Sequence, residues 1–268
     1  MILSILKTFI YMFLSIWPPY LGFFLTSHII KEYYENNRQM LINIILALAL
    51  LFYYSRSFIY VMLFLSIYAI IVVGNISLKK LEIIGEFDKG IIVSILSVFC
   101  VFLIYHLNME FINEILQQVK VNISNELTKV SNDNIKIIEE AISQAYELFF
   151  SFLFLYVFST YILTSYLSRS SKIMNWKLSY VHLIWYIIAY ILYYLNIDNI
   201  FTKNTIKIIQ NIYIIYGLKE IIMYLQNHKK NKSKLLAISF GALVYVISPV
   251  IPFVYGSISS FEIFKKKH

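Results

Sequence analysis

One hydrophobic segment carries polar side chains that could bind a small molecule. Within residues 206–225, Lys207, Gln210 and Asn211 fall within about 100° of one another if the segment is an α-helix. Polar groups are costly inside a bilayer and often mark a substrate pathway. We therefore predict that these three residues form a ligand-binding face that lines a cavity between helices.

Structural roles are the alternatives for this segment. Lys207 could snorkel to the outer membrane surface. Asn211 lies deeper and could instead form a hydrogen bond between helices. Lys219 and Glu220 lie near the other end of the segment, about two turns from a basic loop. Snorkelling is the favoured interpretation for both lysines.

Other polar side chains form no catalytic or metal-binding pattern. Three histidines lie far apart and are interpreted as interfacial or packed residues: His28, His106 and His182. The close acidic pair Glu139-Glu140 is expected on a solvated helix face. A single Cys100 permits no disulfide or zinc-type cluster within the chain. Phosphate-binding glycine motifs and the G-x-S-x-G nucleophile motif are absent. We therefore predict no catalytic residue, metal site, cofactor or enzymatic activity.

The composition places these residues in a membrane protein. Of the 268 residues, 59% are apolar and 14% are charged, whereas soluble domains have about 45–50% apolar and about 25% charged residues. The net charge of +8 is scattered through hydrophobic sequence and forms no basic domain, which argues against nucleic-acid binding. The lipid bilayer is the first expected partner.

Several hydrophobic runs approach the roughly 20 residues that a helix needs to cross a bilayer core. The clearest are residues 89–107, 146–167, 178–195 and 206–225. Two shorter runs, 41–54 and 58–74, are joined only by Ser55, Arg56 and Ser57, which predicts a tight hairpin that need not cross fully. Arg56 would lie at its exposed tip, with anion binding as the alternative.

Prolines interrupt the hydrophobic runs at both ends of the chain. Residues 2–30 are broken by Pro18-Pro19, and residues 235–264 are broken by Pro249 and Pro252. Proline removes a backbone donor and disfavours helical backbone in the residue before it. Each end is therefore predicted to be a kinked span or a short helical hairpin, and we favour the hairpin at the C-terminal end.

Basic residues in short loops predict the orientation. Residues 169–177 contain three basic residues and no acidic one, and residues 227–234 contain four lysines. Both loops are predicted to be cytoplasmic, as are both chain ends. This orientation places residues 109–145 outside, where six acidic residues and three lysines agree with it.

The external segment has a helical pattern of its own. Apolar residues recur every three or four positions from 112 to 130, and a second such stretch follows the break at 131–134. We predict an all-α polytopic protein with about seven or eight membrane helices. Its three parts are N-terminal membrane helices at 1–107, an extracytoplasmic amphipathic helical insert at 108–145, and C-terminal membrane helices at 146–268.

The order of features in residues 108–268 resembles that of the YybS-like family of uncharacterised bacterial multi-pass membrane proteins. The amphipathic helix ends in IIEEAISQAYELFF, and NIYIIYGLKEIIMYLQ and ISPVIPFVYGSISSFEIF follow. Gly217, Gly256 and Lys265 match the glycines and the basic end typical of that family. The sequence departs from the family at Leu148, where a proline often opens the span, and at Ser260.

The resemblance implies a multi-pass protein of the bacterial cytoplasmic membrane. The family is similar in outline to the substrate-binding membrane components of energy-coupling-factor vitamin transporters, which bind one small solute from outside and dock an energising module. The alanine strip that serves docking in those components is absent from the first helix, ILSILKTFIYMFLSIW.

Two functions are therefore expected from the sequence. The first is a transport-type protein that binds a small solute between its membrane helices, with the external insert as a lid. The alternative is a non-catalytic membrane scaffold that recruits a protein partner through the Ile-rich face of the external helices.

Overall fold

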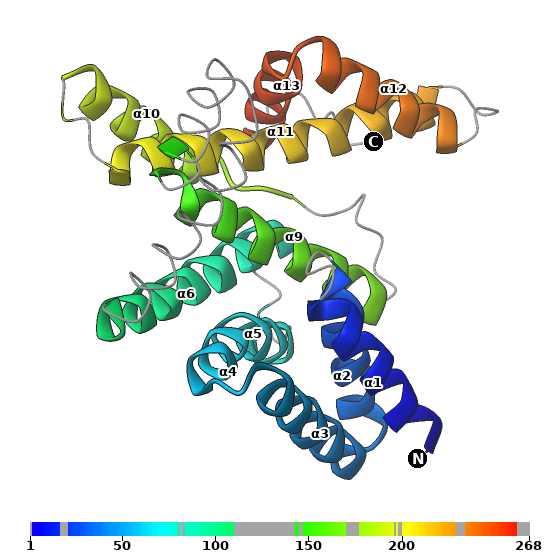
Figure 1. Ribbon diagram of the computed structural model, residues 1–268. Helices are drawn as coiled ribbons and strands as arrows, with labels where there is room; N and C mark the ends of the chain where they lie inside the picture. Colours follow the sequence, from blue (N-terminus) through cyan, green and yellow to red (C-terminus); the bar gives the residue numbers. More distant parts are fainter. Residues whose placement is uncertain are drawn as a thin grey trace, which may run out of the picture. The chain divides into compact units, whose positions relative to one another are not determined.

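The computed structural model describes residues 2–16, 21–79, 81, 84–109, 143–144, 147–169, 177–195, 197, 200–228 and 234–261 (Figure 1). All regular secondary structure in these ranges is helical, which confirms the predicted all-α class. Most of the predicted external insert and of both basic loops lies outside the described residues. The helices and the orientation predicted from these segments therefore stay predictions.

The helices follow the hydrophobic runs of the sequence. They are α1 (Ile2–Ile16), α2 (Phe23–Glu35), α3 (Asn37–Ser55), α4 (Phe58–Phe64), the π-helix η2 (Leu65–Ala69), α5 (Ile70–Leu78), α6 (Glu86–Leu107), α9 (Phe149–Arg169), α10 (Val181–Tyr194), α11 (Ile200–His228), α12 (Lys234–Ile247) and α13 (Val250–Ser260). Five continuous helices of the described chain are long and apolar enough to cross a membrane, or six if the bent pair α12–α13 is one span. The protein is therefore a helical membrane protein.

The chain forms two compact units. Unit 1 contains residues 1–77 and 93–164, and unit 2 contains residues 78–92 and 165–268. The sequence-based division at residues 107 and 145 falls beside or within the undescribed segment and stays a prediction.

Unit 1 begins with an antiparallel helical hairpin. Ser4, near the start of α1, donates a hydrogen bond of 2.5 Å to Glu32, near the end of α2. The two helices therefore run in opposite directions, which is the hairpin alternative predicted for this end of the chain. Buried apolar residues of the unit form one core: Met12, Leu25, Ile29, Ile30, Ala47, Leu51, Val61 and Val72.

The predicted tight hairpin between α3 and α4 is confirmed. Arg56 caps the C-terminal end of α3 in the left-handed region at φ 49°, and its N–H donates to the Phe52 carbonyl at 2.8 Å. Both arms are long enough to cross a membrane. α3 is longer than its hydrophobic run because the side chain of Asn36 accepts hydrogen bonds from the N–H groups of Arg38 and Gln39 and so caps the helix before the run begins.

Unit 2 is organised around α11, against which α10, α12 and α13 pack (Figure 1). α12 and α13 meet at a bend of 112° beside Pro249. The predicted break is therefore present, and the bend excludes a single straight span.

Two glycines bring α11 and α13 into backbone contact. A Cβ added to Gly217 would overlap the carbonyl oxygen of Pro252 and lie 2.9 Å from the backbone nitrogen of Gly256. A Cβ added to Gly256 would overlap the carbonyl oxygen of Tyr213. Small residues permit this close approach, which is a common way for membrane helices to pack.

Candidate functional site

The predicted ligand-binding face lies on α11, with its three residues on adjacent turns. The side chain of Lys207 is exposed, and those of Gln210 and Asn211 are partly buried. The Asn211 amide donates a hydrogen bond of 2.8 Å to the Lys207 carbonyl, one turn earlier in the same helix. This bond differs from the interhelical bond expected as the structural alternative. The ligand-binding role of the three residues stays a prediction.

Lys219 and Glu220 form a buried ion pair further along α11. Lys219 Nζ lies 2.8 Å from Glu220 Oε1, and each residue is only 7% exposed. The ammonium also lies 4.9 Å from the centre of the Tyr216 ring, within the range of a cation–π contact. The snorkelling interpretation of Lys219 is therefore wrong, because a nearby carboxylate and ring hold the ammonium inside unit 2.

A second polar contact in unit 2 joins residues far apart in the sequence. His182 Nε2 lies 2.8 Å from Asp88 Oδ1, and the same oxygen accepts from the Ser179 N–H at 3.4 Å. Tyr213 donates to the Ser179 carbonyl at 2.7 Å. His182 is therefore a packed histidine that links the start of α6 to the start of α10.

Unit 1 contains a buried polar network between α1, α2 and α3. The Ser4 hydroxyl, which donates to Glu32, accepts from the Asn43 amide at 2.9 Å. Gln39 donates to Asn43 at 3.3 Å, and His28 Nε2 lies 3.4 Å from the Ser4 hydroxyl. These contacts satisfy polar groups in the interior. We interpret the network as a structural one that holds the three helices together.

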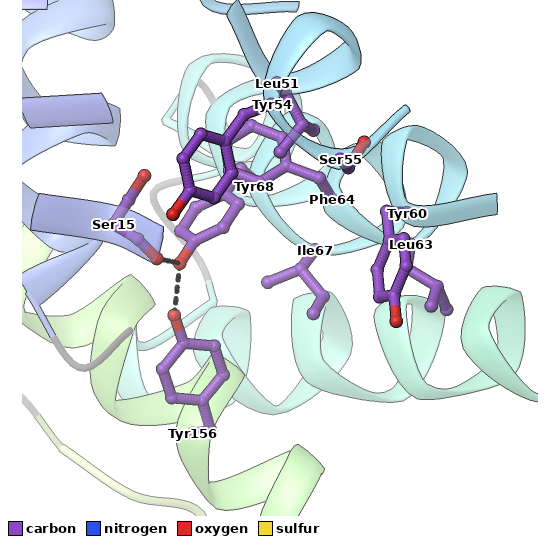
Figure 2. Close-up of a pocket in the computed structure, with 10 residues that line it drawn as sticks. All are labelled: Ser15, Leu51, Tyr54, Ser55, Tyr60, Leu63, Phe64, Ile67, Tyr68 and Tyr156. Carbon is purple, nitrogen blue, oxygen red and sulfur yellow. Dashed lines mark hydrogen bonds between the residues drawn. The ribbon is translucent and has the colours of Figure 1, made fainter. Parts of the chain in front are cut away.

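A cavity of about 410 Å³ opens in unit 1 between α1, the α3–α4 hairpin, the π-helix and α9 (Figure 2). Its walls are mainly aromatic and aliphatic. The lining residues are Ser15, Leu51, Tyr54, Ser55, Tyr60, Leu63, Phe64, Ile67, Tyr68 and Tyr156. None of these ten described residues carries a charge. The cavity is therefore an apolar space with a few hydroxyl groups.

The π-helix positions the central side chain of this cavity. Tyr68 lies within η2 and is only 6% exposed. Its hydroxyl forms a hydrogen bond with the Tyr156 hydroxyl and donates a long bond of 3.4 Å to the Ser15 carbonyl, so it lies between α1 and α9 (Figure 2). Short π-helical segments inside α-helices are frequent at functional sites.

Neighbouring helices accommodate the altered backbone and the tyrosine ring. The Ser97 hydroxyl of α6 donates to the Ser66 carbonyl at 2.6 Å, while the Ile70 N–H bonds the Ile67 carbonyl. A side chain thus bonds the polar backbone of the π-helix, as a membrane interior requires. Gly22, just before α2, leaves room for the Tyr68 ring, because a Cβ added to Gly22 would overlap this ring.

The sequence patterns did not identify Tyr68 and Tyr156 as residues of a site. Both lie well inside hydrophobic runs, whereas tyrosines that anchor a helix lie at its ends. Their depth in the runs is the signal that could have identified them. Their pairing could not be foreseen, because 88 residues separate them.

The fold and the cavity together define a polytopic α-helical membrane protein with a space of ligand size. No family model matches the chain, and no curated protein or solved structure matches it either. Within the described residues, no group of three or more His, Cys, Asp or Glu side chains could hold a metal ion.

Proposed function

We propose that this chain is a transport-type membrane protein that binds a small molecule in the cavity of unit 1. The observation that carries the proposal is the cavity itself, with Tyr68 presented into it by a π-helix. A volume of about 410 Å³ falls within the range of small-molecule sites, which are mostly apolar with a few placed polar groups.

The sequence supports a particular membrane context for this function. We propose seven or eight membrane helices in the bacterial cytoplasmic membrane, both chain ends in the cytoplasm and the insert at 108–145 outside. Ser55, which lines the cavity, ends α3 and would face the outside in this orientation. A solute would therefore enter from the outside, as it does in the vitamin-transporter components to which the YybS-like family is similar in outline. An energising module remains a proposed partner.

Ligand-dependent thermal stability tests the proposal. The purified full-length protein is heated in detergent with a panel of vitamins, amino acids, ions and neutral aromatic compounds. A ligand present at about 100 times its Kd stabilises a protein by about 2.7 kcal/mol. We therefore expect a binding compound to raise Tm by about 5–10 °C.

Two tryptophan variants show whether a shift arises in the cavity. Ile67→Trp fills the cavity and should abolish the shift, whereas Ile45→Trp places the same ring on the exposed face of α3 and should retain it. Asn211→Leu tests the α11 face in the same assay. A shift that is lost in Asn211→Leu and kept in Ile67→Trp would contradict ligand binding in the cavity and favour binding at the α11 face. A panel in which no compound raises Tm would contradict transport-type binding.

A further inference from the structure

The cavity also indicates which class of molecule it holds, an inference that rests on the proposed function. We propose that the ligand is an uncharged molecule with a planar ring and a hydrogen-bond acceptor, which receives its hydrogen bond from the Tyr68 hydroxyl.

The absence of charge in the lining argues for an uncharged ligand. The ten described lining residues contain no acidic or basic side chain. A charged ligand would have to leave water for this apolar space without an ion partner, which costs far more than burying a neutral polar group. Charged solutes such as amino acids and nucleotides therefore fit the lining poorly.

The aromatic walls argue for a planar ring. Four tyrosines and one phenylalanine line the cavity: Tyr54, Tyr60, Phe64, Tyr68 and Tyr156. Aromatic pairs prefer offset-stacked or edge-to-face contacts, which add to the free energy of simple burial. A flexible acyl chain would fill the same volume without these contacts and would lose more conformational freedom.

The hydrogen bonds of Tyr68 argue for an acceptor on the ligand. A phenol can donate only one proton, and Tyr68 donates its proton to the Ser15 carbonyl across 3.4 Å. This distance exceeds that of an ordinary O–H···O bond, 2.5–3.0 Å, so the bond is weak. A carbonyl oxygen on a ligand in the cavity could replace it. Either hydroxyl can donate the hydrogen bond between Tyr68 and Tyr156. In the ligand-bound arrangement that we propose, Tyr156 is the donor of this bond and keeps the Tyr68 ring in place (Figure 2).

Three matched probes test the ligand class by titration calorimetry on the full-length protein. 2-Acetonaphthone is neutral and has a planar ring and a carbonyl group, 2-ethylnaphthalene lacks the carbonyl group, and 2-naphthoate is charged. We expect the ketone to bind most tightly and the charged probe to bind most weakly. Loss of one neutral hydrogen bond should weaken binding about three- to tenfold.

Two phenylalanine variants identify the donor. Tyr68→Phe keeps the ring and removes the hydroxyl, so it should weaken ketone binding about three- to tenfold and leave 2-ethylnaphthalene binding unchanged. Tyr213→Phe removes the hydroxyl of another buried tyrosine, bonded to the Ser179 carbonyl in unit 2, and should leave binding of both probes unchanged.

The outcomes separate this inference from the proposed function. If 2-naphthoate bound as tightly as the ketone, or if Tyr68→Phe weakened neither probe, the ligand class would be wrong although a cavity that binds small molecules remained. Binding in detergent that disappeared in phosphatidylcholine nanodiscs would show that a lipid chain fills the cavity and would also overturn the class. Failure of these probes together with the whole panel would overturn both proposals.

Discussion

The helices of the two units pack against one another in different ways. In unit 2, Gly217 and Gly256 let α11 and α13 touch backbone to backbone, and an ion pair lies buried on the same α11. In unit 1, large aromatic side chains and a π-helix surround a cavity without charged walls. Backbone contact between helices leaves no room for a ligand, whereas the bulky side chains of unit 1 hold their helices apart around a cavity. Unit 1 therefore contains the space in which we propose small-molecule binding, whereas the helices of unit 2 pack tightly.

The largest expected effect comes from breaking the ion pair of unit 2. Lys219→Met removes the cation that Glu220 bonds inside the unit, and breaking a buried pair in this way costs about 3–5 kcal/mol. Unfolding in detergent, followed by circular dichroism, measures this loss. The double variant Lys219→Met with Glu220→Met should regain most of it. Equal loss in the single and double variants would show that the pair does not stabilise unit 2 as an ion pair.

A somewhat smaller effect is expected at the glycine contact. In Gly217→Ala, the new methyl group meets the backbone of α13, which cannot rotate away as a side chain can. We expect a loss of about 3 kcal/mol, at the upper end of typical overpacking costs. Gly241→Ala is the matched control, because among the described residues its methyl group meets only the Ile222 side chain, at 3.1 Å. Similar unfolding curves for the two variants would refute backbone contact as the reason for the tight packing.

The sequence predicted the all-α class and most of the described helices, but not the contrast between the two units. Hydrophobic runs and proline breaks identified the helices, because length and apolarity are properties of a single segment. Lys219 was misplaced because snorkelling is judged from the distance along one helix, whereas its burial depends on what packs around it. The hydrophobic run at 58–74 gave no indication of the π-helix, because Tyr68 looks like any other apolar residue of the run. The Tyr68–Tyr156 contact joins segments 88 residues apart, and spacing along the chain carries no information about it.

A smaller effect should follow from removing the side chain that bonds the π-helix. Ser97→Ala deletes the hydroxyl that donates to the Ser66 carbonyl. Loss of such a bond in the interior costs about 1–3 kcal/mol. Ser159→Ala is the control on α9, because the exposed Ser159 donates to the Tyr156 carbonyl of its own helix, and its loss should change stability by less than about 0.5 kcal/mol. Equal unfolding midpoints for both variants would mean that Ser97 is not needed to hold the π-helix.

The smallest expected change in stability is the most informative about the cavity. Gly22→Ala places a methyl group against the Tyr68 ring, and this ring is the far end of a flexible side chain that can turn into the cavity. The backbone of Gly22 is already right-handed helical, with φ −58° and ψ −20°, so alanine adds no backbone strain. We expect a cost of about 1 kcal/mol, at the lower end of typical overpacking costs, together with loss of 2-acetonaphthone binding.

Gly74→Ala is the matched control in the same unit, because its methyl group meets the Val93 side chain, which does not line the cavity. It should lower stability by a similar amount and keep ketone binding. If Gly22→Ala also kept ketone binding, the position of the Tyr68 ring would not control the cavity. The cavity of unit 1 would then bind the ketone wherever this ring lies, and the contrast between the two units would not depend on Tyr68.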